Sequence, residues 1–271
     1  MSVQSDLKRV TVSSLWKMKS DGEKIVSLTA YDAGFSAVLD EAGVDVILVG
    51  DSLGMVIQGH ETTIPVTVDD MIYHCKAVAS RCQRALLMVD MPFMSYTSTE
   101  QAMTTAAALM RKGAAHMVKL EGDARQVETV RKLSEHGVPV CAHIGLQPQL
   151  IHKLGGYQVQ GRDAKAATAM LEDAHELEKA GADMMLLECV PDILAAEITA
   201  NLNIPVIGIG ASPKCDGQIL VLHDILGITP GRVPRFAHNF LQGRDSIQAA
   251  VSAYVESVKK GQFPKQEHLF S

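Results

Sequence analysis

The feature that most constrains the fold is a regular alternation of short apolar runs with longer amphipathic stretches along the whole chain. Eight apolar runs are candidate strands: Ile25–Ala30, Val46–Gly50, Leu86–Asp90, His116–Glu121, Val138–His143, Met184–Cys189, Val206–Gly210 and Arg235–Phe240. Segments with helical spacing lie between them: Asp69–Cys82, Thr99–Lys112, Ala124–His136, Ala164–Ala180 and Ser246–Lys260. Strands that alternate with helices in this way are typical of parallel sheets covered by helices. We therefore expect residues 1–271 to form a single (β/α)8 TIM barrel, a catalytic domain, rather than an open doubly wound sheet.

Composition and charge narrow the classes of function. The formal net charge is −6, and the chain has no basic stripe or zinc-finger spacing, which argues against nucleic acid as a partner. The short N-terminal segment (about 1–20) is polar and lacks the apolar core of a signal peptide, and no apolar run is as long as a membrane span. The five cysteines form no CxxC pair, which indicates reduced thiols. We expect a cytoplasmic protein that does not bind membranes.

Two predicted connections are unusually long. One follows the second candidate strand, from Ser52 to Val68, and the other follows the fifth, from Ile144 to Asp163. Long ordered loops in compact domains tend to be functional lids or interface elements. We expect these two loops to contribute to a site or to an interface.

Acidic residues interrupt the apolar runs near their ends. VILVGDS ends in Asp51, LLMVDMP carries Asp90, HMVKLEG ends in Glu121, and MMLLECV carries Glu188, while His143 lies in VCAHIG. In a barrel the carboxyl ends of all strands meet at one rim, where the chemistry of this fold is found. A single acid there is usually explained by solvation, but several acids that converge need a cation or a shared proton. We therefore interpret Asp51, Asp90 and Glu121 together as functional.

The ligands available for such a cation are oxygen atoms. His143 stands alone and the cysteines are dispersed, so no cluster has zinc spacing. Carboxylates with open positions for water and substrate suit Mg²⁺, with Mn²⁺ or Co²⁺ as substitutes. Such an ion can polarise a carbonyl and stabilise an enolate. We expect Asp51, Asp90 and Glu121 to bind Mg²⁺.

Three neighbouring residues have more than one interpretation. Lys119 lies two positions before Glu121, so both side chains point to the same face of the strand; Lys119 either neutralises a carboxylate substrate or balances the acids. Glu188 lies across the barrel from Asp51 and is a candidate general base rather than a metal ligand. His143 either contacts substrate or is a polar strand-end residue with its hydrogen bonds satisfied.

Two short motifs suggest other functions. Gly50-Asp51-Ser52-Leu53 matches the GDSL signature of a serine esterase class. That class also carries a DxxH motif near its C-terminus, which is missing here, because Lys265 stands three positions before His268, where the motif has Asp. Gly208-Ile209-Gly210 resembles the start of a dinucleotide fingerprint, but Pro213 occupies the third glycine position. We interpret the first as part of the acidic rim and the second as a tight turn after a strand.

Several long segments resemble the ketopantoate hydroxymethyltransferases (3-methyl-2-oxobutanoate hydroxymethyltransferases). They are VSLTAYDAGFSAVLDEAGVDVILVGDSLGMVIQGH, TIPVTVDDMIYHCKAV, LLMVDMPFMSY, VKLEG, AHIGLQPQ, GIGASPKCDGQILVLHDILG and FPKQEHLF. The resemblance runs from about Leu15 to Phe270. One departure is Ser212 in GIGASP, where we expect Gly in many relatives; this small replacement does not affect the metal-site interpretation.

The resemblance implies a barrel enzyme of pantothenate biosynthesis. Such enzymes transfer a hydroxymethyl group from 5,10-methylenetetrahydrofolate to 3-methyl-2-oxobutanoate and give 2-dehydropantoate and tetrahydrofolate. By resemblance, the metal ligands for one Mg²⁺ per subunit fall on Asp51, Asp90 and Glu121, and the proton acceptor falls on Glu188. The implied substrate-binding residues are Tyr31, Ser52, Lys119 and His143, together with Asp51 and Asp90. The resemblance also implies a homo-oligomer, a decamer of two stacked pentameric rings.

Both lines of reasoning lead to one mechanistic hypothesis. A 2-oxo acid chelates the metal, Glu188 removes the proton from its C3 carbon, and the enolate attacks the methylene carbon of the folate. Lys119 and Ser52 orient the oxo acid. One rival is a lyase or mutase of the isocitrate lyase and phosphoenolpyruvate mutase group, whose KKCGH-like loop is not present in this sequence. A second rival is a non-catalytic ligand-binding barrel.

Overall fold

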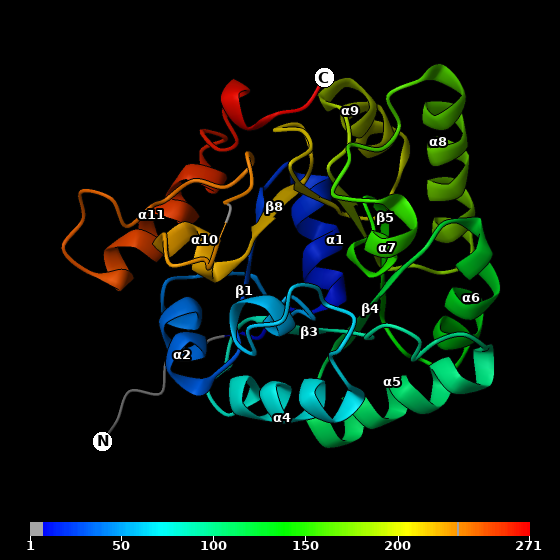
Figure 1. Ribbon diagram of the computed structural model, residues 1–271, viewed down its shortest axis with the longest axis horizontal. Helices are drawn as coiled ribbons and strands as arrows, with labels where there is room; N and C mark the ends of the chain where they lie inside the picture. Colours follow the sequence, from blue (N-terminus) through cyan, green and yellow to red (C-terminus); the bar gives the residue numbers. More distant parts are fainter. Residues whose placement is uncertain (1–7, 232) are drawn as a thin grey trace.

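The chain folds into a closed barrel of eight parallel strands surrounded by helices (Figure 1). A computed structural model describes residues 8–231 and 233–271. The strands pair in sequence order, and β8 closes on β1. They are β1 Ile25–Thr29, β2 Val46–Val49, β3 Leu86–Asp90, β4 Met117–Glu121, β5 Val140–Gly145, β6 Met184–Glu188, β7 Val206–Ile209 and β8 Gly217–Leu220. The predicted (β/α)8 TIM barrel is confirmed.

The helices begin where the sequence places capping residues. They are α1 Val12–Asp21, α2 Ala33–Glu41, α3 Leu53–Val56, α4 Val68–Ala79, α5 Thr99–Gly113, α6 Val127–Glu135, α7 Ile151–Leu154, α8 Ala164–Lys179, α9 Asp192–Asn201, α10 Leu222–Leu226 and α11 Ile247–Lys259, with short 3-10 turns η1 Ala124–Gln126, η2 Pro148–Leu150 and η3 Gln266–His268. Before six of the helices a Thr, Ser or Asp side chain accepts a hydrogen bond from a backbone N–H of the first turn: Thr11, Asp32, Thr67, Ser98, Asp163 and Ser246. Such caps satisfy donors that the helix itself leaves free.

The strands are buried on both faces. Every residue of β1, β2, β3, β4, β7 and β8 is buried, as the near-continuous apolar runs of the sequence predict for parallel strands. In Figure 1, α4, α5, α6 and α8 lie along one half of the ring, and α2 and α11 lie on the other. The core is therefore one continuous cluster, and the strands form a rigid frame for whatever their ends carry.

Helix α1 covers the amino-terminal end of the barrel. The indole nitrogen of Trp16 donates to the carbonyl of Asp183, just before β6, at 2.9 Å. The Lys19 ammonium lies 2.6 Å from Asp216, just before β8. Leu15 on the same helix is buried. The polar N-terminal segment expected from the sequence thus contains a helix that was not predicted, and it seals the end opposite the strands' carboxyl termini.

The eighth strand was assigned wrongly. Arg235–Phe240 is irregular, and the strand that closes the barrel is Gly217–Leu220. No helix separates β7 from β8 among the described residues, so the expected spacing of one helix per strand fails there. A Cβ on Gly217 would lie 2.3 Å from the Ile25 carbonyl oxygen, so glycine allows the two strands to approach. Phe240 is buried instead by ring packing against Tyr254, at 5.4 Å between centroids, which explains its strand-like apolar pattern.

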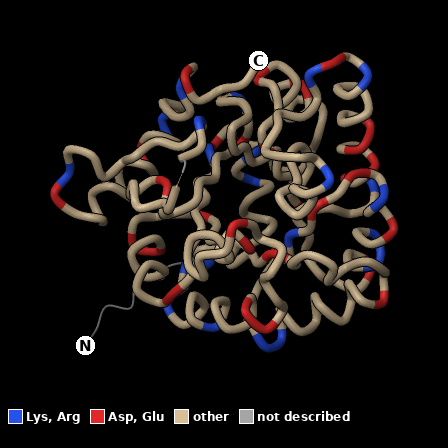
Figure 2. Tube along the Cα trace, viewed as in Figure 1, with Lys and Arg blue, Asp and Glu red and all other residues tan. Residues whose placement is uncertain are grey.

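Both long connections predicted from the sequence are present. The first contains α3, and the second contains η2 and α7. Figure 2 shows acidic and basic residues mixed along the outer helices, with further charged residues inside the ring. Within residues 8–231 and 233–271, each helix is too short or too polar to cross a lipid bilayer.

Tyr254 on α11 gives a test of barrel closure. Its hydroxyl donates toward the carbonyl oxygens of Ser27 in β1, at 2.9 Å, and Gln218 in β8, at 3.1 Å, and its side chain is fully buried. Tyr254→Phe should lower the free energy of unfolding by about 1–2 kcal/mol, because the hydrogen bond is lost without a cavity. Denaturant unfolding measures this. Tyr73→Phe, on a side chain that is 71% exposed, is the matched control, and equal effects of the two changes would contradict the role of Tyr254.

Candidate active site

The strand ends bring the predicted residues together at one rim. Asp51 follows β2, Asp90 ends β3, Lys119 and Glu121 lie on β4, His143 lies on β5, and Glu188 ends β6. Asp90 is paired in register with Lys119, and Glu121 with His143. Because all strands are parallel, these side chains share the carboxyl-terminal mouth of the barrel. We call Asp51, Asp90, Glu121, Glu188 and Lys119 the acid centre.

Lys119 is the cation of the acid centre. Its side chain is 5% exposed, and its ammonium nitrogen lies 2.7 Å from Asp90 Oδ1. Burial opposes the charge, but the carboxylates of Asp90 and Glu121 outweigh burial and raise the pKa of Lys119. Lys119 is therefore charged, and it balances part of the acid centre, as one of the two interpretations expected.

Asp51 and Asp90 lie against each other. The backbone N–H of Asp51 donates to Asp90 Oδ2 at 3.0 Å. Burial, with the nearby Asp90 carboxylate, raises the pKa of Asp51 to about 7. A Cβ at Gly50 would lie 2.8 Å from Ser52 Oγ and 3.4 Å from Asp90 Oδ2, so a glycine there permits this close approach.

Glu121 is held by a residue that the sequence did not single out. The backbone N–H of Gln149 donates to Glu121 Oε2 at 3.1 Å, and its side-chain amide donates to Asp51 Oδ2 at 2.9 Å. The hydroxyl of Tyr96 donates in turn to Gln149 Oε1 at 2.5 Å. Gln149 lies in η2, within the second long connection, so that loop does reach the site. The available signal was the pair of amide side chains in AHIGLQPQ, Gln147 and Gln149, shortly after a strand end.

Glu188 lies across the ring from Asp51, as expected from its strand, and the His143 ring lies between Glu188 and Glu121. β6 lies opposite β2 in the closed ring. Burial raises the pKa of Glu188 to about 8, against the opposing effect of Lys119. Its Oε2 atom is 3.4 Å from His143 Nε2, a buried atom without a hydrogen bond in the described structure. Burial, with the charge on Lys119, lowers the pKa of His143 well below its usual value, so the ring is neutral.

Tyr31 and Ser52 form a pair beside the acid centre. Their hydroxyl oxygens are 2.9 Å apart. Tyr31 is 2% exposed, and burial raises the pKa of its phenol. In the described part of the chain, Ser52 Oγ therefore has a phenol and not a histidine as its hydrogen-bond partner, which agrees with rejecting the GDSL esterase interpretation.

The GIG motif is a turn, as expected. Gly208 lies in β7, and Gly210 follows the strand with a φ of 57°. A Cβ on Gly210 would lie 2.7 Å from the Phe236 ring. The turn packs against side chains, and no helix follows it directly to present N–H groups to a pyrophosphate within the described residues.

The donor set fits a hard divalent cation. Four carboxyl groups face one buried lysine, and the raised pKa values of Asp51, Glu121 and Glu188 reflect burial and mutual repulsion. A divalent ion would relieve that repulsion, and carboxylate oxygens are the ligands that Mg²⁺ prefers. The side chains are not preassembled as a chelate, since no group of three or more His, Cys, Asp or Glu across the described ranges already has metal-ligand spacing.

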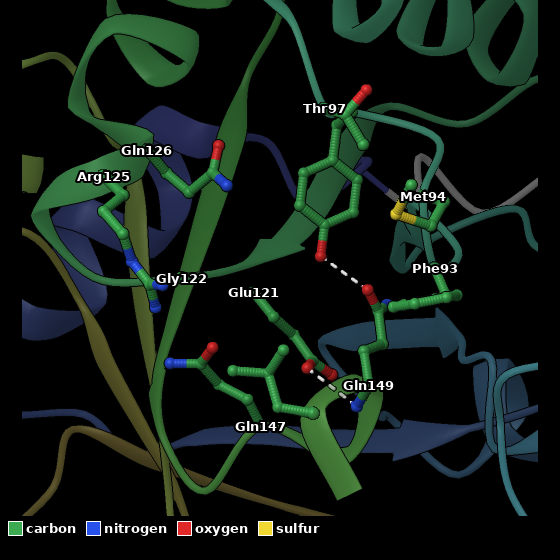
Figure 3. Close-up of a pocket in the computed structure, with 11 residues that line it drawn as sticks. Phe93, Met94, Thr97, Glu121, Gly122, Arg125, Gln126, Gln147 and Gln149 are labelled. Atoms are coloured by element: carbon green, nitrogen blue, oxygen red, sulfur yellow. Dashed lines mark hydrogen bonds between the residues drawn. The ribbon is translucent and has the colours of Figure 1, made fainter. Parts of the chain in front are cut away.

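A cavity of about 190 Å³ opens beside Glu121 (Figure 3). Its lining comes from the loops after β3, β4 and β5, and Gln149 belongs both to this lining and to the acid centre's hydrogen bonds. We call it the side cavity.

Comparison with known proteins identifies the family. The family model described as ketopantoate hydroxymethyltransferase matches residues 9–266. The 3-methyl-2-oxobutanoate hydroxymethyltransferase of Alkalilimnicola ehrlichii is 60% identical over 96% of this chain and 94% of its own length. The protein of the same name from Marinobacter nauticus is 59% identical over 96% of this chain and 98% of its own length.

Solved structures with a similar fold are more distant in sequence. A phosphoenolpyruvate phosphomutase from Streptomyces platensis subsp. rosaceus superposes with a TM-score of 0.61 at 11% identity, over 80% of this chain and 83% of its own. A phosphonopyruvate hydrolase complex with oxalate and Mg²⁺ has a TM-score of 0.58 at 15% identity, over 80% and 82%. At such identities the likeness shows the fold alone. The family match and the close relatives over nearly the full length show that this chain belongs to the ketopantoate hydroxymethyltransferases, a family of transferases.

Proposed function

We propose that this enzyme transfers a hydroxymethyl group from 5,10-methylenetetrahydrofolate to 3-methyl-2-oxobutanoate, giving 2-dehydropantoate and tetrahydrofolate in pantothenate biosynthesis. The observation that carries the proposal is the acid centre: buried carboxyl groups around Lys119, with Glu188 on β6, the strand opposite β2. The carrier supplies one carbon and water supplies the hydroxyl oxygen, so the net reaction consumes one water.

Asp51, Asp90 and Glu121 would hold one Mg²⁺ per subunit. When bound, such an ion polarises the ketone of a 2-oxo acid and makes the neighbouring C–H more acidic. Lys119 supplies a fixed positive charge 2.7 Å from Asp90, suited to the substrate carboxylate. Ser52 and Tyr31, paired at 2.9 Å, offer hydroxyl groups that orient the oxo acid.

Glu188 would accept the proton from C3. Burial keeps its pKa near 8, so it is a far stronger base than an exposed carboxylate. The neutral ring of His143, 3.4 Å away, can contact the substrate or orient Glu188. The resulting enolate attacks the methylene carbon and forms the new C–C bond. Both C–N bonds to the carrier break, water supplies the hydroxyl group, and the two carrier nitrogens take up the proton from C3 and one proton from water.

The cellular setting follows the family. We propose a homodecamer in the cytoplasm that binds small-molecule substrates and neither nucleic acid nor membranes. The five cysteines are buried and free, which suits a reducing compartment.

Replacement of Glu188 tests the base. Glu188→Gln should lower the exchange of the C3 proton of 3-methyl-2-oxobutanoate with deuterated solvent by about a hundredfold or more, because the proton acceptor is lost. Binding of Mg²⁺ and oxo acid, followed by calorimetry, should persist. Exposed Glu197→Gln is the matched control. Normal exchange in Glu188→Gln would remove Glu188 from this role.

The same substitution tests the buried state of Glu188. The pKa of the Glu188 carboxyl group is 4.5 in an ordinary setting and about 8 in the folded chain. Between these pH values the unfolded chain releases this proton more readily than the folded chain, so rising pH favours unfolding. The stability of metal-free Glu188→Gln relative to the parent protein should therefore increase by about 2–4 kcal/mol from pH 5 to pH 8. Thermal and denaturant unfolding across this range measure it. A difference independent of pH, as expected for Glu197→Gln, would show that Glu188 ionises freely.

Replacement of Asp51 tests the metal site. Asp51→Asn should weaken Mg²⁺-dependent binding of the oxo acid by about 10- to 100-fold, since a charged ligand is lost. Calorimetric titration with and without Mg²⁺ measures it, with exposed Asp69→Asn as the control. Unchanged Mg²⁺ dependence would exclude Asp51 as a ligand.

A further inference from the structure

The side cavity has two chemically different walls. In Figure 3, Arg125, Gln126 and Gln147 lie on one side of Glu121, and Phe93 and Met94 lie on the other. The first wall offers a guanidinium and two amides, and the second offers apolar surface. A flat ligand with an apolar face and a polar edge matches such a lining.

The apolar wall is held open by its own loop. Met94 is 60% exposed and has a φ of 61°, a left-handed conformation that is unfavourable for a side chain other than glycine or asparagine. Gln101 on α5 fixes this loop: its amide nitrogen donates to the Met94 carbonyl at 2.8 Å, and its amide oxygen accepts from the Thr97 N–H at 2.9 Å. An exposed methionine kept in a strained conformation beside a cavity indicates a contact surface, and its sulfur packs well against aromatic rings.

The floor of the cavity is shared with the acid centre. Glu121 lines the cavity and accepts the Gln149 N–H, while the Gln149 side chain reaches Asp51 at 2.9 Å. A ligand in the cavity therefore lies one side chain away from the place proposed for the oxo acid. Because the oxo acid is placed at the acid centre, the adjoining cavity of about 190 Å³ is left for a second molecule.

We propose that the side cavity binds the reduced folate, with a ring of the carrier against Phe93 and Met94 and its glutamyl carboxylates at the mouth beside Arg125. This inference rests on the proposed function. The amides of Gln126 and Gln147 match the donors and acceptors on the edge of a pterin. Arg125 is 62% exposed, and its ion pair with Asp123 at 2.7 Å is made through Nε, so the two terminal nitrogens of the guanidinium can face a carboxylate at the mouth.

The test compares two arginines of the same segment. Arg125→Ala removes the cavity's guanidinium, and Arg131→Ala on α6, 42% exposed and paired with Glu128, makes the same change of charge outside the cavity. Met94→Ala tests the apolar wall independently. For each variant of the full chain with Mg²⁺, tetrahydrofolate binding is measured by calorimetry, and the KM values for 5,10-methylenetetrahydrofolate and for the oxo acid are measured separately.

We expect Arg125→Ala and Met94→Ala each to weaken tetrahydrofolate binding and raise the folate KM by about three- to tenfold, with the oxo-acid KM changed less than about twofold. Arg131→Ala should behave as the parent protein. Parent-like tetrahydrofolate binding in both cavity variants would overturn the assignment, and so would equal losses in Arg125→Ala and Arg131→Ala. A parent protein that binds tetrahydrofolate but transfers no carbon would instead overturn the proposed function, because the binding measurement needs no turnover.

Discussion

The ion pair between Lys119 and Asp90 is the interaction on which the site depends. A lysine in the middle of a barrel strand is costly to bury, and it is tolerated here because carboxylates surround it. Those carboxylates outnumber it, so burial and then the repulsion between neighbouring carboxylates raise the pKa values of Asp51 and Glu121, and the centre is short of positive charge. This shortage explains why the acid centre suits a divalent cation and an anionic oxo acid without any preassembled cluster of ligands.

Such a strained centre requires a frame whose stability comes from elsewhere. The strands are buried along their length, α1 seals the amino-terminal end through Trp16 and Lys19, and Tyr254 joins β1 to β8 at the seam of the ring. These contacts are remote from the strands' carboxyl ends. The division between a stabilising end and a chemical end is a general property of this barrel, and it allows buried, mutually repelling acids at the mouth.

The parts of this arrangement that follow from local pattern could be predicted from the sequence. Apolar runs that end in Asp90 or Glu121 identify both a strand and the end of it that carries acidic side chains, because the apolar pattern of the strand stops at the acidic residue. Gly217–Leu220 was missed because it is short, contains Gly and Gln, and follows β7 without a helix, while Phe240 is apolar for a different reason, ring packing. Gln149 was missed because its role depends on how a loop folds back across the rim. The spacing of residues along the chain does not predict that contact.

Gln149 joins the acid centre to the side cavity. Its backbone N–H fixes Glu121 and its side chain fixes Asp51, while Tyr96 holds its amide oxygen. The acid centre and the side cavity thus share a wall made of one loop residue and one strand residue. Because the Gln149 amide has a fixed donor end and a fixed acceptor end, a shift of the loop at the cavity side changes the hydrogen bond to Asp51. The loop after β5 therefore contacts both regions through one residue.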